Sequence, residues 1–258
     1  MKKWIITAGI LLAVGLILLA VCLAIVGFDF MKLGTKNMQT HTYGVEEAFT
    51  HIRVDGLTAD VTFLPAEDKQ LRVVCYEDEK LPYSVYVEED TLVITCKDNR
   101  KWYDYIGFNF ESATVTVYLP AGEYGDLKIS CVTGALTVPE QFTFQNAYVE
   151  LTTGDACWKA GVSQDLSIQC TTGDIFIGNA LCNRLFAKAT TGDIRLNRVD
   201  ATEIEIKTTT GDVTGTLLSG KVFTTKVTTG DVDVPHGDFD GTCKVTTTTG
   251  DVNLKIEK

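Results

Sequence analysis

Six aspartates of this chain occur in one repeated context, the motif Thr-Thr-Gly-Asp, and they are Asp155, Asp174, Asp193, Asp212, Asp231 and Asp251. A row of carboxylate oxygens suits calcium. However, the sequence lacks the Gly-Gly-x-Gly-x-Asp nonapeptide of calcium-binding β-rolls, and aspartate commonly accepts backbone N–H bonds at its own turn. We therefore interpret these residues first as turn residues and keep them as weak candidates for a metal site. No cofactor is expected.

Three lysines, Lys188, Lys207 and Lys226, each stand four residues before the glycine of this motif. In stacked units they would lie on the outer face of three successive coils. Such a row could bind anionic wall polymers, or another envelope protein, at a cell surface. Charge rows are usually solvated faces, and Glu205 would neutralise part of this one. The lysines are therefore candidate binding residues, with a solvated face as the alternative.

Five aromatic residues fall within nine positions, and they are Trp102, Tyr103, Tyr105, Phe108 and Phe110. Exposed aromatic side chains among polar neighbours can bind sugars, peptides or lipid headgroups. A repeat array also needs caps that cover its open core. Because the segment precedes the regular repeats, we favour a cap and retain a binding patch as the alternative.

The repeat itself predicts the elements that position these side chains. The motif glycines are 19 or 20 residues apart, and they are Gly154, Gly173, Gly192, Gly211, Gly230 and Gly250, with a degenerate copy at residues 132–135. Apolar residues predominate seven, five and three positions before each glycine, and polar residues lie between them. This period-2 alternation indicates a strand with one buried face. It resumes after the glycine, so each unit is a strand, a corner, a shorter strand and a return loop.

A fixed period of this length is typical of stacked repeats. We predict an all-β fold, a single-stranded, β-helix-like β-solenoid with coils of about 19 residues. An antiparallel sandwich is the alternative, since a strand and its turn need about 9–10 residues there. Identical corners favour direct stacking. The solenoid is expected over residues 45–258, irregular over 45–126 and regular over 127–258, after a stalk at 29–44. Whether Cys75 and Cys96 pair is left open.

The N-terminal segment reads as a membrane anchor. Ile5–Val26 has no charged side chain and follows two lysines. These 22 residues span about 33 Å as a helix, enough for a hydrocarbon core of about 30 Å. Residues 1–28 are therefore predicted to be a cytoplasmic start and a single transmembrane helix, with the C-terminal domain outside the cell. A cleaved signal peptide and a lipoprotein signal at Cys22 are alternatives.

Charge and motifs narrow the functional classes. The formal net charge of −11 argues against nucleic acid as a partner, because phosphate binding needs a basic surface. The chain has no His-Glu-x-x-His, Gly-x-Ser-x-Gly or phosphate-binding glycine loop. An enzyme is not expected. A carbohydrate-active enzyme that uses the aspartate row is the least favoured class, because catalysis needs one special constellation rather than six equal copies.

The short basic start, the single apolar span and the repeated Thr-Thr-Gly-Asp-[Ile/Val] units resemble the LiaG-like family of bacterial envelope proteins. These are often described as "putative adhesins" or β-strand-repeat proteins of unknown function. The resemblance implies a place in the cell envelope and a link with envelope stress, and it carries no catalytic residues. We expect a membrane-anchored, extracytoplasmic binding or scaffolding module. A sensor or modulator of a neighbouring membrane signalling protein is the alternative.

Overall fold

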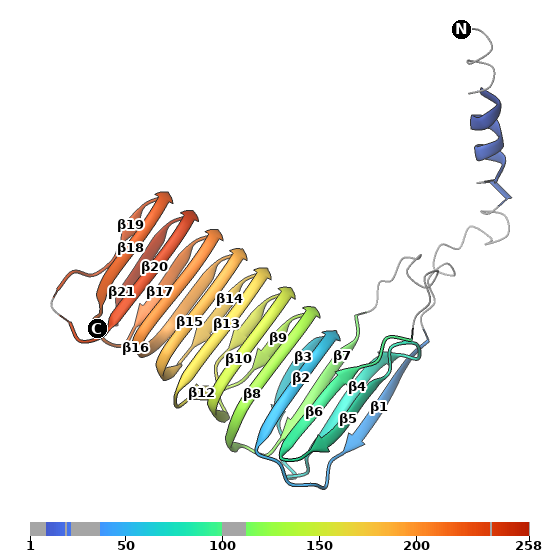
Figure 1. Cartoon of the computed structure of the whole chain (residues 1–258), viewed down its shortest axis with the longest axis horizontal. Helices are drawn as coiled ribbons and strands as arrows, with labels where there is room; N and C mark the ends of the chain where they lie inside the picture. The colour runs from blue at the N-terminus through green and yellow to red at the C-terminus, as the bar shows by residue number, and fades with distance from the viewer. Residues whose placement is uncertain (1–8, 19, 22–36, 100–111, 238, 258) are drawn as a thin grey trace. The chain divides into compact units, whose positions relative to one another are not determined.

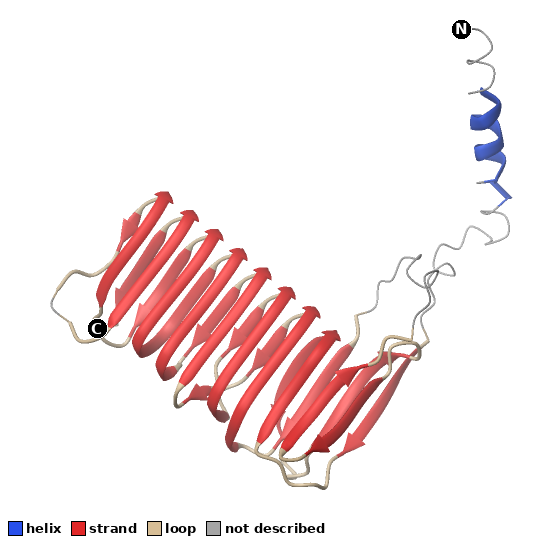
Figure 2. Cartoon of the chain, in the orientation of Figure 1, coloured by secondary structure: helices blue, strands red, loops and turns tan. Residues whose placement is uncertain are grey.

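The computed structural model describes residues 9–18, 20–21, 37–99, 112–237 and 239–257. The chain divides into two units, residues 1–37 with 99–111, and residues 38–98 with 112–258. In the first unit, residues 9–18 and 20–21 are helical. Within the described part of the chain, no helix has the length and apolar character that a membrane crossing requires. Residues 5–8, 19 and 22–26 of the predicted span Ile5–Val26 lie outside the described residues. The second unit consists of strands (Figure 2).

The strands of the second unit form two layers that run along an elongated stack (Figure 1). Sheet B holds the strands that lead into the corners. Its strands pair in parallel from β6 to β18, and β5 is antiparallel to β6. In spatial order they are β5 (Tyr83–Glu88), β6 (Thr91–Cys96), β2 (His51–Thr58), β8 (Gly122–Thr133), β10 (Phe142–Thr153), β13 (Asp165–Thr172), β15 (Leu181–Thr191), the second part of β16 (Ile194–Thr210), β20 (Thr242–Thr249) and β18 (Val222–Thr229); the short β12 (Gly161–Val162) also pairs with β10.

Sheet A holds the strands that leave the corners. It is parallel from β7 to β19, and β1 and β4 continue it as antiparallel strands. In spatial order the strands are β1 (Met38–Gly44), β4 (Arg72–Asp78), β7 (Thr114–Leu119), β3 (Asp60–Pro65), β9 (Leu136–Val138), β11 (Ala156–Trp158), β14 (Ile175–Gly178), the first part of β16, β17 (Val213–Leu217), β21 (Val252–Ile256) and β19 (Val232–Asp233).

The core lies between the two sheets and follows the alternation of the sequence. In β13 the residues at 166, 168 and 170 are buried and those between them are partly exposed. The buried apolar side chains form one cluster along the stack, with large aromatic side chains such as Phe63, Phe144 and Trp158 in its N-terminal half. The indole N–H of Trp158 donates to the carbonyl of Ala160 at 2.9 Å. The all-β prediction is thus confirmed, and the coils pair in parallel rather than as an antiparallel sandwich.

Each corner needs its glycine for two reasons. Gly192 has a φ of 140°, which L side chains rarely adopt. A Cβ on it would also lie 2.0 Å from the carbonyl oxygen of Gly173 in the neighbouring coil. Ala59 stands at the glycine place of the coil formed by β2 and β3, and it is not among the residues of positive φ. In the neighbouring coil, a Cβ on Gly134 would collide with the carbonyl oxygen of Ala59.

The last two coils are stacked out of sequence order. β20 pairs with β16 on one side and with β18 on the other, and β21 lies likewise between β17 and β19. The C-terminal coil is therefore inserted between the two coils that precede it in the chain. The sequence reading placed the units in chain order, which is wrong here. Because the Thr-Gly-Asp corners are the same, the C-terminal coil can stack beside the coil of β16 and β17 as well as beside the coil of β18 and β19.

The N-terminal end shows the same rearrangement. The coil of β2 and β3 lies between β6–β7 and β8–β9, although β6 and β7 come later in the chain. Antiparallel strands β1, β4 and β5 close this end. Strand β1 falls in residues 29–44, which the composition placed in a stalk. That interpretation does not hold for 38–44, because β1 pairs with β4 along its whole length.

Candidate functional site

The corner aspartates form one ladder that bonds neighbouring coils. In each case a carboxylate Oδ1 accepts the backbone N–H of the aspartate in the next coil, at 2.8–2.9 Å. The ladder runs in the order Asp155, Asp174, Asp193, Asp212, Asp251 and Asp231. The carboxylate of Asp60 likewise accepts the backbone N–H of Ala135, at 2.8 Å. The expectation that each carboxylate bonds its own turn is wrong: the acceptor and the donor belong to different coils.

The ladder leaves these carboxylates engaged rather than gathered around a cation. Arg195 reaches two of them, with N–O distances of 2.9 Å to Asp174 and 2.7 Å to Asp193. The N–H of Asp193, together with the Arg195 guanidinium, lowers the pKa of Asp174 below its usual value. Across the described ranges, no three His, Cys, Asp or Glu side chains are grouped so that they could hold a metal ion. The ladder therefore joins neighbouring coils through hydrogen bonds.

The lysine row differs from its prediction because of the inserted coil. Lys188 and Lys207 are register partners on adjacent strands. On its other side Lys207 pairs with Thr246 of β20, and Thr246 in turn pairs with Lys226 of β18. Lys188, Lys207 and Lys226 therefore do not occupy three successive coils. Two adjacent lysines and one separated by a threonine make a shorter basic row.

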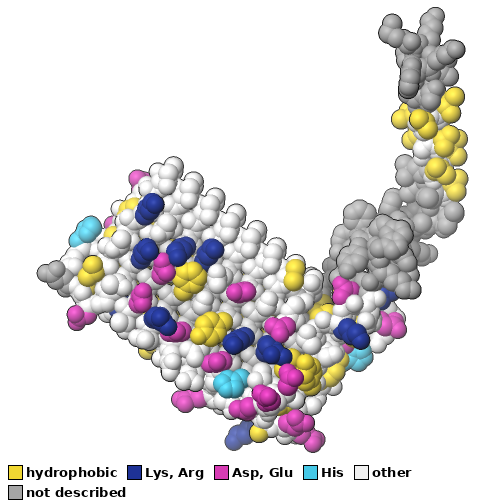
Figure 3. All heavy atoms as spheres, viewed as in Figure 1, with side chains coloured by type: hydrophobic (Ala, Val, Ile, Leu, Met, Phe, Trp, Pro, Cys, Tyr) yellow, Lys and Arg dark blue, Asp and Glu magenta, His cyan; other side chains and the backbone are white. Residues whose placement is uncertain are grey.

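The outer face of sheet B carries side chains that do not repeat. Six residues before the corner glycine, the residues are, in spatial order, Lys128, Tyr148, Ser167, Phe186, Glu205, Lys244 and Thr224. Figure 3 shows charged and hydrophobic side chains interspersed over the coils, while most of the margin along the arrowheads of Figure 1 is white. That margin is where the threonines of the corners lie. The outer face of sheet B is therefore chemically varied, in contrast to the corners.

Most charges on this face are paired. Arg184 holds Asp165 through two bonds of 3.1 and 2.6 Å, and its hydrogen bond lowers the pKa of Asp165. Glu205 lies 3.0 Å from Lys207 and 3.3 Å from Lys244, and the bond from Lys207 is the main cause of its lowered pKa. The Nζ of Lys207 also lies 5.2 Å from the ring centroid of Phe186.

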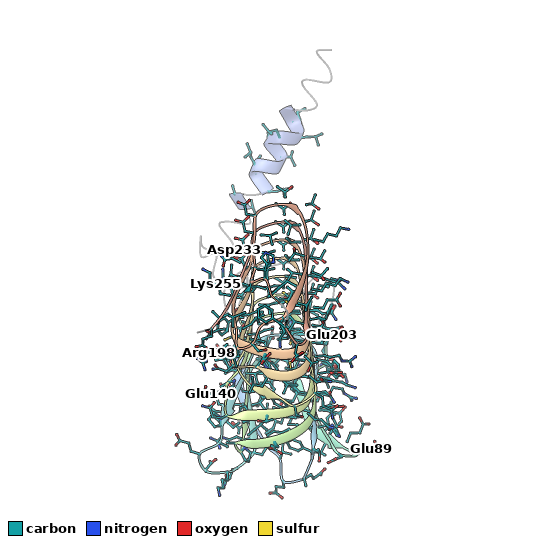
Figure 4. The ribbon with its side chains drawn as sticks, turned by 90° about the vertical axis from the view of Figure 1, so that its left-hand side faces the viewer. Glu89, Glu140, Arg198, Glu203, Asp233 and Lys255 are labelled. Atoms are coloured by element: carbon teal, nitrogen blue, oxygen red, sulfur yellow. The ribbon has the colours of Figure 1, made fainter. Side chains whose placement is uncertain are left out.

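The two broad faces of the stack point in opposite directions. Viewed along the stack, Glu203 and Glu89 project from one side, and Arg198, Lys255, Asp233 and Glu140 project from the other (Figure 4). The first side is the outer face of sheet B. Within the described residues, Glu203 belongs to no ion pair, although it lies beside Arg184 in the register. It is a carboxylate that remains available to a ligand.

A buried polar network closes the N-terminal end, and the sequence reading missed it. Glu77 is 1% exposed. Its carboxylate contacts His41 Nδ1 at 2.5 Å and accepts bonds from the Tyr43 hydroxyl, at 3.3 Å, and from the Tyr83 backbone N–H. Burial and the nearby Glu77 raise the pKa of Tyr43 to about 12. The signal was present, because Glu77 follows Val73 and Cys75 on the inward side of β4.

A second buried charge lies near the other end. Lys221 is 5% exposed, and its Nζ lies 2.6 Å from Asp200 and 2.7 Å from the Ser219 hydroxyl. That hydroxyl donates to Asp200 at 2.9 Å. The three groups satisfy one another at the edge of a hollow of about 330 Å³. This cluster fixes the turn between β17 and β18, where the chain passes over the inserted coil.

Four cysteines, Cys75, Cys131, Cys170 and Cys243, are buried and behave as small core residues. Cys75 is a free, buried thiol, so it does not bridge to Cys96, and burial raises its pKa to about 12. Cys131 and Cys170 share a column, with Leu151 between them. The aromatic group Trp102, Tyr103, Tyr105, Phe108 and Phe110 lies outside the described residues, so its assignment as a cap or a patch stays a prediction.

This arrangement of stacked coils matches a known family. Residues 49–258 match the family described as Toastrack DUF4097. The chain belongs to this family. The Toastrack region therefore contains every strand from β2 to β21, including both rearranged ends and the whole aspartate ladder. No curated protein matches the chain.

Similar solved structures are described as adhesion proteins or as a lipid binding protein. A "putative adhesin" from Bacteroides fragilis is similar with a TM-score of 0.57 and 15% identity, over 87% of this Toastrack chain and 99% of the other. A "putative cell adhesion protein" from Clostridium sporogenes has a TM-score of 0.41 and 11% identity, over 86% and 100% of the two chains. A "putative lipid binding protein" from Parabacteroides distasonis has a TM-score of 0.36 and 14% identity, over 86% and 98%. The first likeness supports the shared fold.

Proposed function

We propose that this Toastrack chain is a binding module of the bacterial cell envelope, in which a β-solenoid scaffold presents the outer face of sheet B to a partner. The observation that carries the proposal is the contrast on that scaffold. The corners repeat the same residues, whereas the outward column of sheet B changes from coil to coil and includes the exposed Tyr148 and the half-buried Phe186. Exposed aromatic side chains are costly to leave in water without a partner and are enriched at binding surfaces.

The proposal includes an N-terminal membrane anchor and an extracytoplasmic domain. It is supported by the charge-free segment Ile5–Val26 after two lysines. The helical residues in this segment carry exposed apolar side chains, as at Ile10, Leu12 and Ile17, whose exposed fractions are 59, 69 and 62%. A helix that is apolar all round favours a lipid surrounding. The resemblance to LiaG-like proteins extends the proposal to a role in envelope stress.

The relatives support the same proposal from a different side. The similar solved structure from Bacteroides fragilis is described as a "putative adhesin", and adhesion is a binding function at a cell surface. A rigid stack of coils is suited to this task, because each coil contacts its neighbours and holds the outward side chains at fixed spacing. We propose no catalytic activity for the chain.

The proposed topology can be tested in cells. Cells that express the full chain with a C-terminal epitope tag are fractionated, and the tag is probed with antibody before and after lysis. The proposal predicts that the chain sediments with membranes and that the tag is accessible on intact cells once the wall is opened. The variant Leu12→Arg/Leu16→Arg should lose membrane association. A tag that is accessible only after membrane lysis would refute the proposed topology.

The binding function needs a separate measurement. The purified full chain, in detergent micelles, is mixed with isolated wall and with membranes, and bound protein is sedimented. Retention on either fraction above that of a heat-unfolded sample is expected. Recovery of one membrane protein rather than a polymer would favour the sensor or modulator role. If neither fraction retains the chain, the binding module is refuted.

A further inference from the structure

Two aromatic side chains on sheet B face each other across a serine. Tyr148 on β10 pairs in register with Ser167 on β13, and Ser167 pairs with Phe186 on β15. All three point outward, since the residues on either side of them in each strand are buried. Tyr148 is 39% exposed. The small serine leaves an open slot between two larger rings.

The slot is a real hollow with a size that limits its occupant. It measures about 230 Å³ and is lined by Tyr148, Ser167 and Phe186 together with Asp165, Arg184 and Glu203. Pockets that take drug-sized ligands measure about 300–1,000 Å³. A hollow below that range accommodates a single ring rather than an extended ligand.

The strand spacing sets the width of the slot. Neighbouring strands lie about 4.8 Å apart, so the backbones that carry Tyr148 and Phe186 are separated by about 9.6 Å. A saturated six-membered ring placed midway would lie about 4.8 Å from each aromatic ring, and the C–H groups above and below its mean plane would reach toward both. A flat aromatic ligand would lie further from both rings than close stacking requires.

The rim of the slot offers hydrogen bonds without a strong net field. Asp165 is held by Arg184, and Glu205 beyond Phe186 is held by Lys207 and Lys244. These pairs cancel most of the charge that would attract a cation or an anion. The remaining groups, the Ser167 hydroxyl and the Glu203 carboxylate, suit a ligand with hydroxyl groups around its edge.

We propose that this slot binds one pyranose ring of a glycan, sandwiched between Tyr148 and Phe186 with its hydroxyl groups directed to Ser167, Arg184 and Glu203. The inference deepens the proposed binding function and rests on it. Lys207, which lies over the Phe186 ring from the next coil, supports that ring from the side away from Ser167. The sugar ring class is therefore selected by spacing, and its hydroxyl pattern by the rim.

The test uses the full chain labelled for NMR, in micelles of a detergent without a sugar headgroup. Neutral trisaccharides of N-acetylglucosamine, glucose and mannose are titrated to millimolar concentration while amide signals are followed. We expect at least one of them to shift the amide of Ser167 and its register neighbours. Shifts with none of the three sugars would overturn the proposal, as would shifts with choline or phosphate as the sole effective probes.

Variants locate the site. Tyr148→Ala and Phe186→Ala should each weaken the binding about fivefold or more, because each removes one ring contact. Ser167→Leu should abolish binding by filling the slot while the melting temperature stays near that of the wild type. Tyr86→Ala is the matched control, because Tyr86 is an exposed tyrosine of the same sheet on β5. Equal loss in Tyr86→Ala, or undiminished binding in Ser167→Leu, would overturn the slot.

The same variant separates this inference from the proposed function. If Ser167→Leu is retained by isolated wall as the wild type is and also binds the trisaccharide undiminished, the binding module stands and the sugar slot is refuted. If the wild type is not retained by either fraction but binds a trisaccharide at Ser167, the slot stands and the envelope role is refuted.

Discussion

The corner row and the outer face of sheet B belong to the same coils and use the repeat in opposite ways. At the corners, glycine and aspartate recur because backbone geometry and inter-coil hydrogen bonds demand them. Six residues before the corner glycine, the outward side chain of sheet B changes from each coil to its neighbour. In this repeat protein, the residues that recur in every coil maintain the fold. The positions that differ between coils are where a ligand can be recognised.

The largest loss of stability is expected from replacing a corner glycine. Gly192→Ala forces an L side chain to a φ of 140° and drives a Cβ against the Gly173 carbonyl oxygen, 2.0 Å away. We expect a loss of unfolding free energy of about 4 kcal/mol or more, measured by urea unfolding of the full chain. Gly44→Ala is the control, since nothing lies within 4 Å of its Cβ position. Equal stability of the two variants would contradict the corner account.

A smaller effect is expected from one rung of the aspartate ladder. Asp212→Ala removes the acceptor of the Asp251 N–H and should cost about 1 kcal/mol. Asp212→Asn keeps an oxygen at the same place and should retain most of that stability. Because this rung joins the inserted coil to its neighbour, the pair also tests the coil order. A loss that is the same for both variants would show that charge, not the hydrogen bond, matters.

The ladder also predicts a pH dependence. The folded-state pKa of Asp174 is lowered, mainly by the Asp193 N–H and then by Arg195. Its stabilising contribution is therefore complete above the unfolded-state pKa of about 3.9 and is lost as the pH falls below that value through the folded pKa. Asp174→Asn should flatten the fall in stability below about pH 4, measured by thermal unfolding. An identical pH profile in the variant would refute this assignment.

The smallest changes are expected on the outer face. Tyr148→Ala and Lys226→Ala should each alter the unfolding free energy by less than about 0.5 kcal/mol, the usual range for surface substitutions. Urea unfolding measures this directly. A large destabilisation by Tyr148→Ala would mean that the exposed ring serves packing, and the division between corner and face would fail.

Much of the fold follows from local patterns, and the order of the coils does not. The alternation before Gly173 predicted that Leu166, Ile168 and Cys170 share the buried face, as they do. The spacing of the glycines predicted parallel coils. Nothing in the corners distinguishes Thr246 from Lys226 as the neighbour of Lys207, because the same corner fits beside any other. The insertion of the C-terminal coil is decided by the chain ends and turns, such as the one held by Lys221.

The candidate site was predictable only in part. Lys188 and Lys207 were identified from their place in the repeat, because a repeated residue is visible in the sequence. Tyr148 and Phe186 were not, since they occur once each in a column whose meaning depends on which strands are neighbours. Glu77 could have been found from its inward position in β4, where a carboxylate must find partners.

The most direct test of the division between corner and face is envelope retention by the Ser167→Leu chain, measured beside its melting temperature. The account predicts that the variant melts as the wild type does and is no longer retained by isolated wall, whereas the wild type is retained. Undiminished retention at an unchanged melting temperature would contradict it.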